Sequence, residues 1–531
     1  MSETAASQVT GDGGLPAVRS RPRRKRRRER GVALVLVLGA LTILTVMLAD
    51  FQDEASSELG SALSARDSVR AEYAARSAVQ LARLLIASEP TIRKGLAPLF
   101  FLTGGSPPQI PVWLFADQVL GAFNDQAGMA KFQALAGVQM DKGKKLGIEG
   151  ASFDVDIIDE DSKINLNSAW RDPLTQMRLA SQIMGLISGP QYEPLFTSRD
   201  GDGQYSDRMQ ICGALIDWAD ANQDLTTCDF RSGVGPSTGP EDSFYQLLDP
   251  PYFRKNAPYD SLEELHMVRG VSDDFWANFI DPDPKNPKRR NVTVWGSGKI
   301  NVNTANPMTL LAFICGAAAP TPKICLDPLE AAKFLSLMNL IGTFTAGAPI
   351  FGSPQFFLDT LAQKNFVGVF LQKFGLEPIM FASANEAKKA LSTESKVFTF
   401  VATGRVKTGQ RDARVQIRAV VDFRGAPSPA QLMQNQVAGQ LGAQAAGALG
   451  QLGLTPPGTM PGATGAPGMG MGMGMGMGLG GDQSGQMNAL PYAGFQPGVP
   501  PPGMPAGTTP DGNFAFLMPS PGGRIVYFRI D

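Results

Sequence analysis

Three polar side chains at alternate positions of one acidic segment are the residues best suited to bind a ligand. Asp220, Asn222 and Asp224 follow an apolar run that ends at Trp218. Oxygen donors at this spacing match the first three ligands of a calcium loop, because a chain that curls around a cation brings alternate side chains to it. The glycine and the late glutamate of an EF-hand are missing. The segment therefore predicts either a structural Ca²⁺ site or a solvated acidic turn.

The four cysteines fall into two close pairs, Cys212 with Cys228 and Cys315 with Cys325. In an oxidising compartment each pair can form a local disulfide, and two pairs of free buried thiols are the alternative. A single histidine, His266, makes a zinc site or a catalytic triad hard to build. No nucleophile, base and acid converge in the sequence, so we expect that the protein is not an enzyme.

Near the N-terminus, a dense basic run leads directly into a long apolar segment. Nine of the 48 Lys and Arg residues lie in residues 19–30, and no charged residue occurs from Val32 to Ala49. As a helix, this uncharged segment spans roughly 27 Å, close to a bilayer's hydrocarbon core. The arginines keep the N-terminus in the cytoplasm, so everything after Asp50 is exported. A cleaved secretory signal has a shorter apolar core, and a plain uncleaved anchor is the main alternative.

The helices and strands that must position these residues can be predicted from the spacing of the apolar residues. Spacings of three and four continue the apolar helix to the breaker Pro90. Its candidates for covering a sheet are Tyr73, Ala74, Val79, Leu81 and Leu85. Alternating apolar residues predict a strand at 153–157, a hairpin from strands 397–405 and 413–423, and a final strand at 524–531.

Between these strands the chain contains a short internal repeat, and we call its two copies the echoes. Residues 163–169 read KINLNSA and residues 299–305 read KINVNTA, and each copy leads through a capping residue into a helical run. The copies enclose LIDWADANQD at 215–224 and the segment DPPYFRKNAPYDSLEELHMVRGV at 249–271.

Together these segments resemble one family. A basic leader, Gly31 and an unbroken apolar helix are similar to the N-terminus of type IV pilins and pseudopilins. Leu36 stands where that family usually has a glutamate, and this absence, together with the echo and its enclosed segments, resembles minor pseudopilin K of type II secretion systems. The resemblance implies that prepilin peptidase cuts after Gly31 and leaves Val32 as the new N-terminus. It also implies that Glu241 or Asp242 closes the Ca²⁺ site.

The implied fold class is α+β: a type IV pilin-like fold, in which a long N-terminal helix packs on a small antiparallel sheet, with a large, mainly α-helical inserted domain. The expected parts are a basic leader (1–31), the transmembrane pilin helix (32–89), the first part of the pilin-like domain (90–168), the inserted domain (169–392), the hairpin (393–424), a Gly/Pro/Met-rich insertion (425–523) and the last strand (524–531). Residues 425–523 bury too little apolar surface to order themselves, so we expect disorder there. Their methionines also suit Cu(I), which is the alternative.

The resemblance implies a minor pseudopilin at the tip of the pseudopilus, which initiates assembly and helps to export folded proteins. The implied partners are the other minor pseudopilins, the major pseudopilin, prepilin peptidase and the inner-membrane assembly platform. The expected location is the inner membrane, with a single pass and a periplasmic C-terminal domain. Nucleic acid is not an expected partner, because the exported part is acidic. A minor pilin of a type IV adhesion or competence filament and, less favoured, an anchored periplasmic enzyme are the alternatives.

Overall fold

The computed structural model describes residues 29–101, 107–124, 150–199, 205–229, 233–345, 347–409, 411–427 and 522–531, apart from the side chains of 29–30, 98–101, 229 and 233–241. One helix, α1 (Glu29–Phe101), makes up the first range. Residues up to Asp67 and residues from Ser68 onward form two separate compact units. The first unit holds the apolar half of α1, and the second holds the rest of the described chain.

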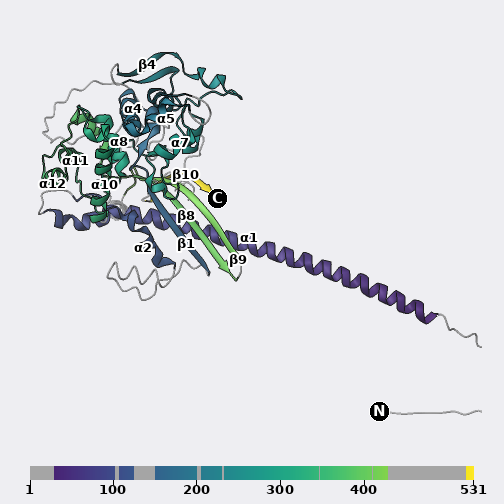
Figure 1. The fold of residues 1–531 in the computed structure, drawn as a ribbon. Helices are drawn as coiled ribbons and strands as arrows, with labels where there is room; N and C mark the ends of the chain where they lie inside the picture. Colours follow the sequence, from purple (N-terminus) through teal and green to yellow (C-terminus); the bar gives the residue numbers. More distant parts are fainter. Residues whose placement is uncertain are drawn as a thin grey trace, which may run out of the picture. The chain divides into compact units, whose positions relative to one another are not determined.

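A four-stranded antiparallel sheet is the frame of the second unit, in the order β1-β8-β9-β10 (Figure 1). Its strands are β1 (Ala151–Asp159), β8 (Val397–Thr408), β9 (Arg411–Asp422) and β10 (Arg524–Ile530). β1 pairs with β8 from Ala151↔Val406 to Asp159↔Phe398, although most of the described chain lies between them in sequence. The predicted first strand, hairpin and final strand are confirmed.

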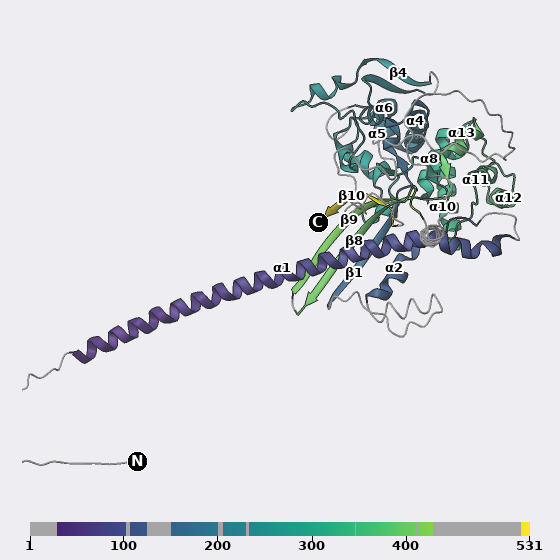
Figure 2. The same ribbon diagram turned by 180° about the vertical axis from the view of Figure 1, so that it is seen from behind.

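The part of α1 from Ser68 onward covers one face of this sheet (Figures 1 and 2). Its buried side chains are small and recur at spacings of four and three: Ala71, Ala75, Ala78 and Ala82. The sheet contributes larger side chains to the same core: Phe153, Val155, Ile157, Phe398, Phe400, Ile417 and Val421. At Gly404 the helix comes so close that an added Cβ would lie 1.9 Å from the Ala71 carbonyl oxygen.

The prediction that all five candidate residues of α1 cover the sheet is wrong for one of them. Ala74 and Val79 are buried and Leu81 and Leu85 are partly buried, but the side chain of Tyr73 is 60% exposed. Successive helical residues are rotated by about 100°, so a residue next to a narrow contact stripe can point away from it. The periodicity of the sequence does not determine which neighbouring residues of the helix lie against the sheet.

The predicted end of α1 at Pro90 is also wrong, because the helix continues to Phe101. Proline removes one helical hydrogen-bond donor. Two contacts from outside the helix hold this turn: a backbone N–H donates to the buried Glu89 carboxylate at 2.9 Å, and Glu394 pairs with Arg93. Within the helix, Arg93 also lies 3.4 Å from Glu89. These tertiary contacts offset the lost hydrogen bond.

The segment between β1 and β8 is a mainly helical insertion, as expected. Its helices are α4 (Pro173–Ile187), α5 (Glu193–Thr197), α6 (Arg208–Asp217), α7 (Asp273–Phe275), α8 (Pro307–Ala317), α9 (Lys323–Leu326), α10 (Pro328–Phe344), α11 (Pro354–Leu361), α12 (Phe366–Lys373) and α13 (Ala384–Lys389). Its short strands are β2 (Ile164–Asn165), β3 (Asp224–Asp229), β4 (Gly233–Pro240), β5 (Val292–Thr293), β6 (Ile300–Asn301) and β7 (Leu391–Ser392). Before β1, α2 (Ala116–Leu120) contacts that strand.

The predicted start of the insertion at residue 169 is too late. Ile164 in the first echo already pairs in parallel with Val292, and Ile300 in the second echo pairs in parallel with Leu391. Both echoes therefore lie inside the insertion, which starts directly after β1. A pairing between residues so distant in sequence leaves no local signal at residue 164.

The two echoes have the same local structure. Asn165 accepts the backbone N–H of Asn167 at 3.0 Å, and Asn301 accepts that of Asn303 at 3.0 Å. The helices that follow them, α4 and α8, pack through glycines. A Cβ at Gly185 would lie 1.9 Å from the Ala312 carbonyl oxygen, and one at Gly316 would lie 2.1 Å from that of Ser181.

We predict that Gly404→Ala destabilises the protein by about 2 kcal/mol or more, since backbone must move to admit the methyl group. The matched control is Gly352→Ala, where an added Cβ meets no atom within 4 Å. Urea unfolding of the purified proteins measures both changes. Equal unfolding midpoints for the two variants would show that α1 and β8 are not in close contact.

Candidate functional site

The predicted processing residues lie in the first unit, at the start of the apolar half of α1. Gly31 and Val32 are helical, and a Cβ at Gly31 would meet no atom within 4 Å. Leu36 is 68% exposed, as a lipid-facing or helix-facing side chain would be. Among the described residues, only this helix is long and apolar enough to cross a membrane. Residues 1–28, which hold most of the leader, lie outside the described residues.

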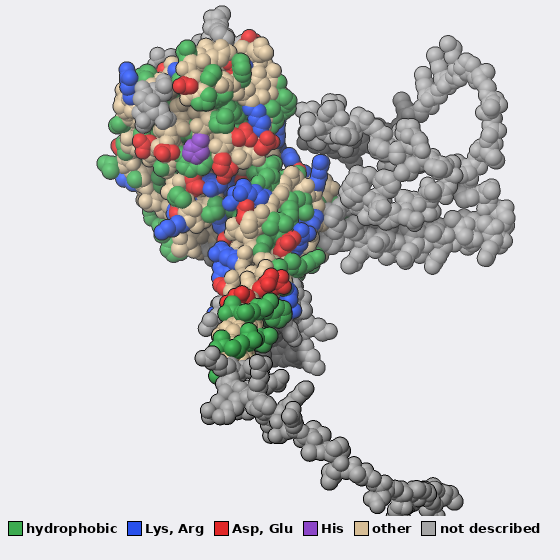
Figure 3. Space-filling model, turned by 90° about the vertical axis from the view of Figure 1, so that its right-hand side faces the viewer, with side chains coloured by type: hydrophobic (Ala, Val, Ile, Leu, Met, Phe, Trp, Pro, Cys, Tyr) green, Lys and Arg blue, Asp and Glu red, His purple; other side chains and the backbone are tan. Residues whose placement is uncertain are grey.

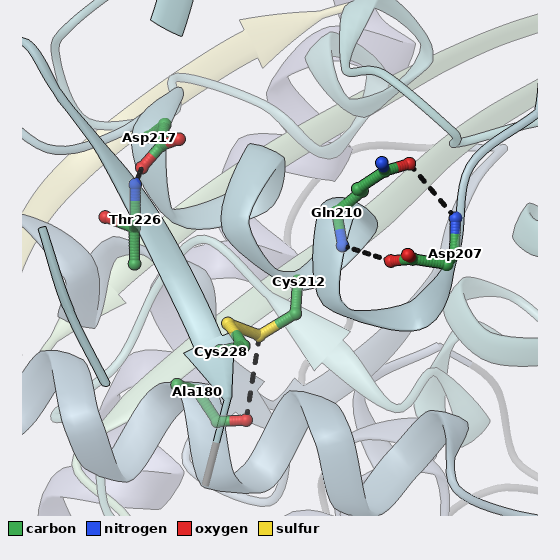
Figure 4. The surroundings of a disulfide bond; sticks show 7 residues. All are labelled: Ala180, Asp207, Gln210, Cys212, Asp217, Thr226 and Cys228. Carbon is green, nitrogen blue, oxygen red and sulfur yellow. Dashed lines mark hydrogen bonds between the residues drawn. A yellow bond between two sulfur atoms is a disulfide. The ribbon is translucent and has the colours of Figure 1, made fainter. Parts of the chain in front are cut away.

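The acidic segment connects α6 to β3. α6 begins with a capping box: Asp207 accepts the backbone N–H of Gln210 at 2.8 Å, and the Gln210 side chain accepts that of Asp207 at 3.2 Å (Figure 4). This cap fixes where the helix starts. The last residue of α6, Asp217, accepts the backbone N–H of Thr226 in β3 at 3.0 Å (Figure 4). The second contact joins the end of α6 to β3 across the loop that carries the acidic segment.

Two of the four predicted Ca²⁺ ligands touch each other. The Asn222 amide donates to Oδ2 of Asp220 at 2.6 Å, and its oxygen accepts the backbone N–H of Asp224 at 2.8 Å. The Asp224 side chain is exposed, and that of Glu241 lies outside the described residues. In the described ranges, no three His, Cys, Asp or Glu side chains are grouped as metal ligands.

Sequence reasoning missed two charged residues beside this loop, Asp217 and Arg254. The Arg254 Nη2 donates to the Asn222 carbonyl at 3.3 Å, and its backbone N–H donates to Asp242 at 3.3 Å. The position of Asp217, a carboxylate inside the apolar run of α6, could have indicated that it belongs to the site. No pattern in the sequence could have indicated Arg254, because it is distant in sequence from the loop.

Burial raises the pKa of Asp217 to about 7 and the pKa of Asp220 to about 6. The charge of Asp220 contributes to this rise at Asp217, while Arg254 lowers the pKa of both. Asp220 is only 3% exposed, and its Oδ1 has no hydrogen-bond partner within the described chain. Two adjacent buried carboxyl groups and one unsatisfied oxygen are an arrangement that a bound cation would stabilise.

Both cysteine pairs are disulfide-bonded. Cys212 in α6 is joined to Cys228 in β3, and both are fully buried against α4, where the Ala180 carbonyl lies 3.9 Å from the Cys212 sulfur (Figure 4). Cys315 in α8 is joined to Cys325 in α9. The first bond clamps the two elements that flank the acidic loop.

The sequence analysis did not predict that a second acidic group, Asp159, Glu160 and Asp161, is buried where β1 enters the insertion. Each carboxylate accepts hydrogen bonds from both sides of this junction. On the insertion side the donors are the Thr304 hydroxyl to Asp159, the Thr293 hydroxyl to Glu160 and the Ser297 N–H to Asp161, all at 2.6 Å. On the side of β8 they are the Ser395 hydroxyl to Asp159 at 2.6 Å, the Thr399 hydroxyl to Glu160 at 2.6 Å and the Lys396 N–H to Asp161 at 2.7 Å.

The pKa values of Asp159 and Glu160 at this junction shift in opposite directions. Burial and the neighbouring Asp161 together raise the pKa of Asp159 to about 7. Burial also acts to raise the pKa of Glu160, but the buried Lys163, 3.1 Å away, and the two threonine hydroxyls outweigh it and leave that pKa below its ordinary value. Glu160 is therefore the ionised partner of Lys163 at neutral pH.

His266, the single histidine, lies on the surface and stacks on Trp276 with 4.3 Å between ring centroids (Figure 3). This contact with Trp276 is an aromatic one.

We predict that Glu160→Gln destabilises the protein by about 3 kcal/mol or more, because it leaves Lys163 buried without a charged partner. The control is Glu386→Gln, which removes a more exposed partner of Arg178 and should cost much less, because solvent screens an exposed ion pair. Chemical denaturation measures both values. A Glu160→Gln protein as stable as the Glu386→Gln protein would contradict the role assigned to this carboxylate.

Comparison with known proteins finds a matching family model and a similar solved structure. Residues 162–280 match the family model described as type II secretion system (T2SS), protein K. Among solved structures, the chain is similar to one in the crystal structure of the GspK–GspI–GspJ complex from the enterotoxigenic Escherichia coli type 2 secretion system, with 16% identity over 51% of this chain and 75% of that chain. The TM-score is 0.29, so this similarity fixes no arrangement of elements. No curated protein matches the chain. The match over residues 162–280 agrees with the family that the motifs indicated: this part of the chain is similar to type II secretion system protein K.

Proposed function

We propose that this protein is a minor pseudopilin of a type II secretion system, placed at the tip of the pseudopilus, where it initiates assembly and helps to export folded proteins. One observation carries the proposal. The segment that matches protein K lies between β1 and β8 of an antiparallel sheet that packs on a long N-terminal helix. The helix and sheet are of the pilin type, and the insertion is of the K type.

Leu36 and the bulk of the insertion support a place at the tip. A glutamate in a membrane helix needs a partner, since an unpaired carboxylate is costly in hydrocarbon. Leu36 makes no such demand on a neighbouring subunit. A subunit without that requirement can be first in the filament, and a large insertion suits a position that ends the filament.

The proposed location is the inner membrane, with the N-terminus in the cytoplasm and the sheet and insertion in the periplasm. The basic leader supports this orientation. The two disulfides agree with an oxidising compartment. The partners would be other minor pseudopilins and the major pseudopilin in the filament, prepilin peptidase at Gly31 and the assembly platform. No catalytic role is part of the proposal.

Processing tests this function directly. In cells with an active prepilin peptidase, the mature protein should begin at Val32, and Gly31→Val should retain the leader and leave folded exoproteins in the periplasm. Gly39→Val, in the same helix and equally free of contacts to an added Cβ, is the control and should be processed. The mass of the purified N-terminal peptide and an exoprotein assay give the results. A wild-type protein that keeps its leader would exclude a pseudopilin.

We also propose a structural Ca²⁺ ion at the acidic loop, held by Asp220, Asn222 and Asp224 and closed by Glu241. The unsatisfied Oδ1 of the buried Asp220 supports it. Hard oxygen donors are the ligands that Ca²⁺ prefers. The ion would add charge compensation to Asp217 and Asp220 and fix the loop that Cys212–Cys228 already clamps.

We expect chelation at pH 8 to lower the melting temperature, and Ca²⁺ at about 100 times its Kd to restore about 2.7 kcal/mol. Without metal, stability should fall as pH rises from about 4 to 7, because the raised folded pKa values of Asp217 and Asp220 favour the protonated folded state. The Ca²⁺ effect should therefore be larger at pH 8 than at pH 5.

Asp220→Asn should abolish the Ca²⁺ effect, and Asp412→Asn, at an exposed position, should not. Melting that responds to neither chelator nor Ca²⁺ would refute the site.

A further inference from the structure

Helix α12 carries apolar side chains on two sides, although only one of them faces the core of the insertion. Gly368 and Leu371 face that core, and an added Cβ at Gly368 would lie 2.5 Å from a backbone oxygen of α11. On the other side Phe366 is 87% exposed, and Phe370 and Phe374 are each about half exposed. We call these three residues the phenylalanine ridge. A helix that is apolar all round is normally buried in a protein core or a membrane, so the ridge indicates a further contact.

The ridge is held in a fixed position. Asn365 caps α12: its side-chain oxygen accepts the backbone N–H of Gly368 at 2.9 Å, and its amide donates to the Thr360 hydroxyl at 2.9 Å. The rings of Phe370 and Phe374 pack edge to face, with 4.8 Å between their centroids. Binding through such a preorganised surface loses little conformational entropy.

The apolar surface continues from the ridge onto α10. A hollow beside Phe374 is lined by Leu329, Leu337 and Leu340 of α10. Leu329 and Leu340 are both exposed, and residues 334–344 of this helix include no charged residue. Single exposed apolar side chains are common in soluble proteins, but contiguous apolar patches mark contacts with proteins or membranes.

Two lysines flank the ridge without acidic partners. Lys364 precedes it and Lys373 lies within it, and both are exposed. No Asp or Glu occurs in residues 360–376. The nearest acids in sequence have other partners, because Asp359 accepts from Gln355 and Glu377 pairs with Lys323. The charge of this surface is therefore complementary to an anionic one.

The combination of rings and lysines favours a lipid surface over a folded protein. Phenylalanines that insert at the level of the headgroups, with lysines beside them, are typical of helices that lie in a membrane interface. Each lysine near an anionic leaflet strengthens such binding roughly fivefold. A protein partner would need a pocket for each protruding ring, whereas a lipid interface admits the rings without one.

The ridge lies far from the point at which α1 enters the second unit. α1 passes Gly404 at Ala71, toward the β8–β9 turn, whereas α12 lies toward the last turns of α1 (Figures 1 and 2). From Ser68 to Phe101 the helix rises roughly 50 Å. A bilayer at the ridge is therefore one that this end of the unit meets.

We propose that the phenylalanine ridge inserts into the interface of an anionic phospholipid bilayer, a second one besides the membrane that holds α1, and that Lys364 and Lys373 contact its phosphate groups. The proposal rests on the membrane anchoring of α1 in the proposed function. It adds a second membrane contact, at the inserted domain.

Flotation of the full-length protein, held through α1 in phosphatidylcholine nanodiscs, tests the proposal. The nanodiscs should float with added vesicles that contain one third phosphatidylglycerol, and at least fivefold less with vesicles of phosphatidylcholine alone. Phe366→Ser/Phe370→Ser should lower flotation at least tenfold, because two rings no longer leave water. Lys364→Gln/Lys373→Gln should reduce flotation to the level seen with phosphatidylcholine.

The matched control is Leu247→Ser/Phe253→Ser, which removes two equally exposed apolar side chains beside Asp249 and should float like the wild type. All variants change exposed residues, so their urea unfolding midpoints should equal that of the wild type. Loss of flotation at an unchanged midpoint assigns the loss to the surface and not to the fold.

Three results would overturn the proposal: wild-type nanodiscs that do not float, equal flotation with both kinds of vesicle, or a control that loses as much as the ridge variant. Nanodiscs that pair with one another when no vesicles are present would place a second copy on the ridge instead. Anchoring is measured separately by co-elution with the nanodisc. Protein that elutes apart from it contradicts the proposed function, and its own flotation with the same vesicles still tests the ridge.

Discussion

Three consecutive buried carboxylates, Asp159, Glu160 and Asp161, join the pilin-like sheet to the inserted domain. Burying three acidic side chains in sequence is unfavourable unless each is hydrogen-bonded. Here each accepts at least one hydrogen bond from the insertion and one from the start of β8 or the residues just before it. The bonds are satisfied only when the sheet and the insertion are docked, so the carboxylates make docking and folding interdependent.

This junction explains how a small sheet carries so large an insertion. β1 and β8 are neighbouring strands, and Asp159 pairs with Phe398, so the insertion leaves and re-enters the sheet at adjacent points. Inside the insertion, the two echoes, the close packing of α4 on α8 and the two disulfides build a core of its own. A rigid connection would let the insertion move as one body with the sheet and the part of α1 from Ser68 onward.

Local patterns in the sequence predicted much of this structure. The uncharged run from Val32, the alternation in the sheet strands and the spacing of the cysteines each reflect a local constraint, and each feature is present. What could not be predicted depends on tertiary contacts. Pro90 does not end α1 because Arg93 and Glu89 are held from outside the helix, and Tyr73 is exposed because the helix touches the sheet along a narrow stripe. Likewise, the sequence at 159–162 reads as a turn, and only its distant donors reveal that its acids are buried.

The account rests on the sheet and the insertion folding as one unit, and urea unfolding of two single-tryptophan variants measures this most directly. One variant keeps Trp113, which packs against Phe398 in the sheet core, and the other keeps Trp218, which is buried in the insertion. We predict the same unfolding midpoint for both, because loss of either part breaks the junction. An insertion that unfolds at lower urea while Trp113 still reports a native sheet would contradict the account.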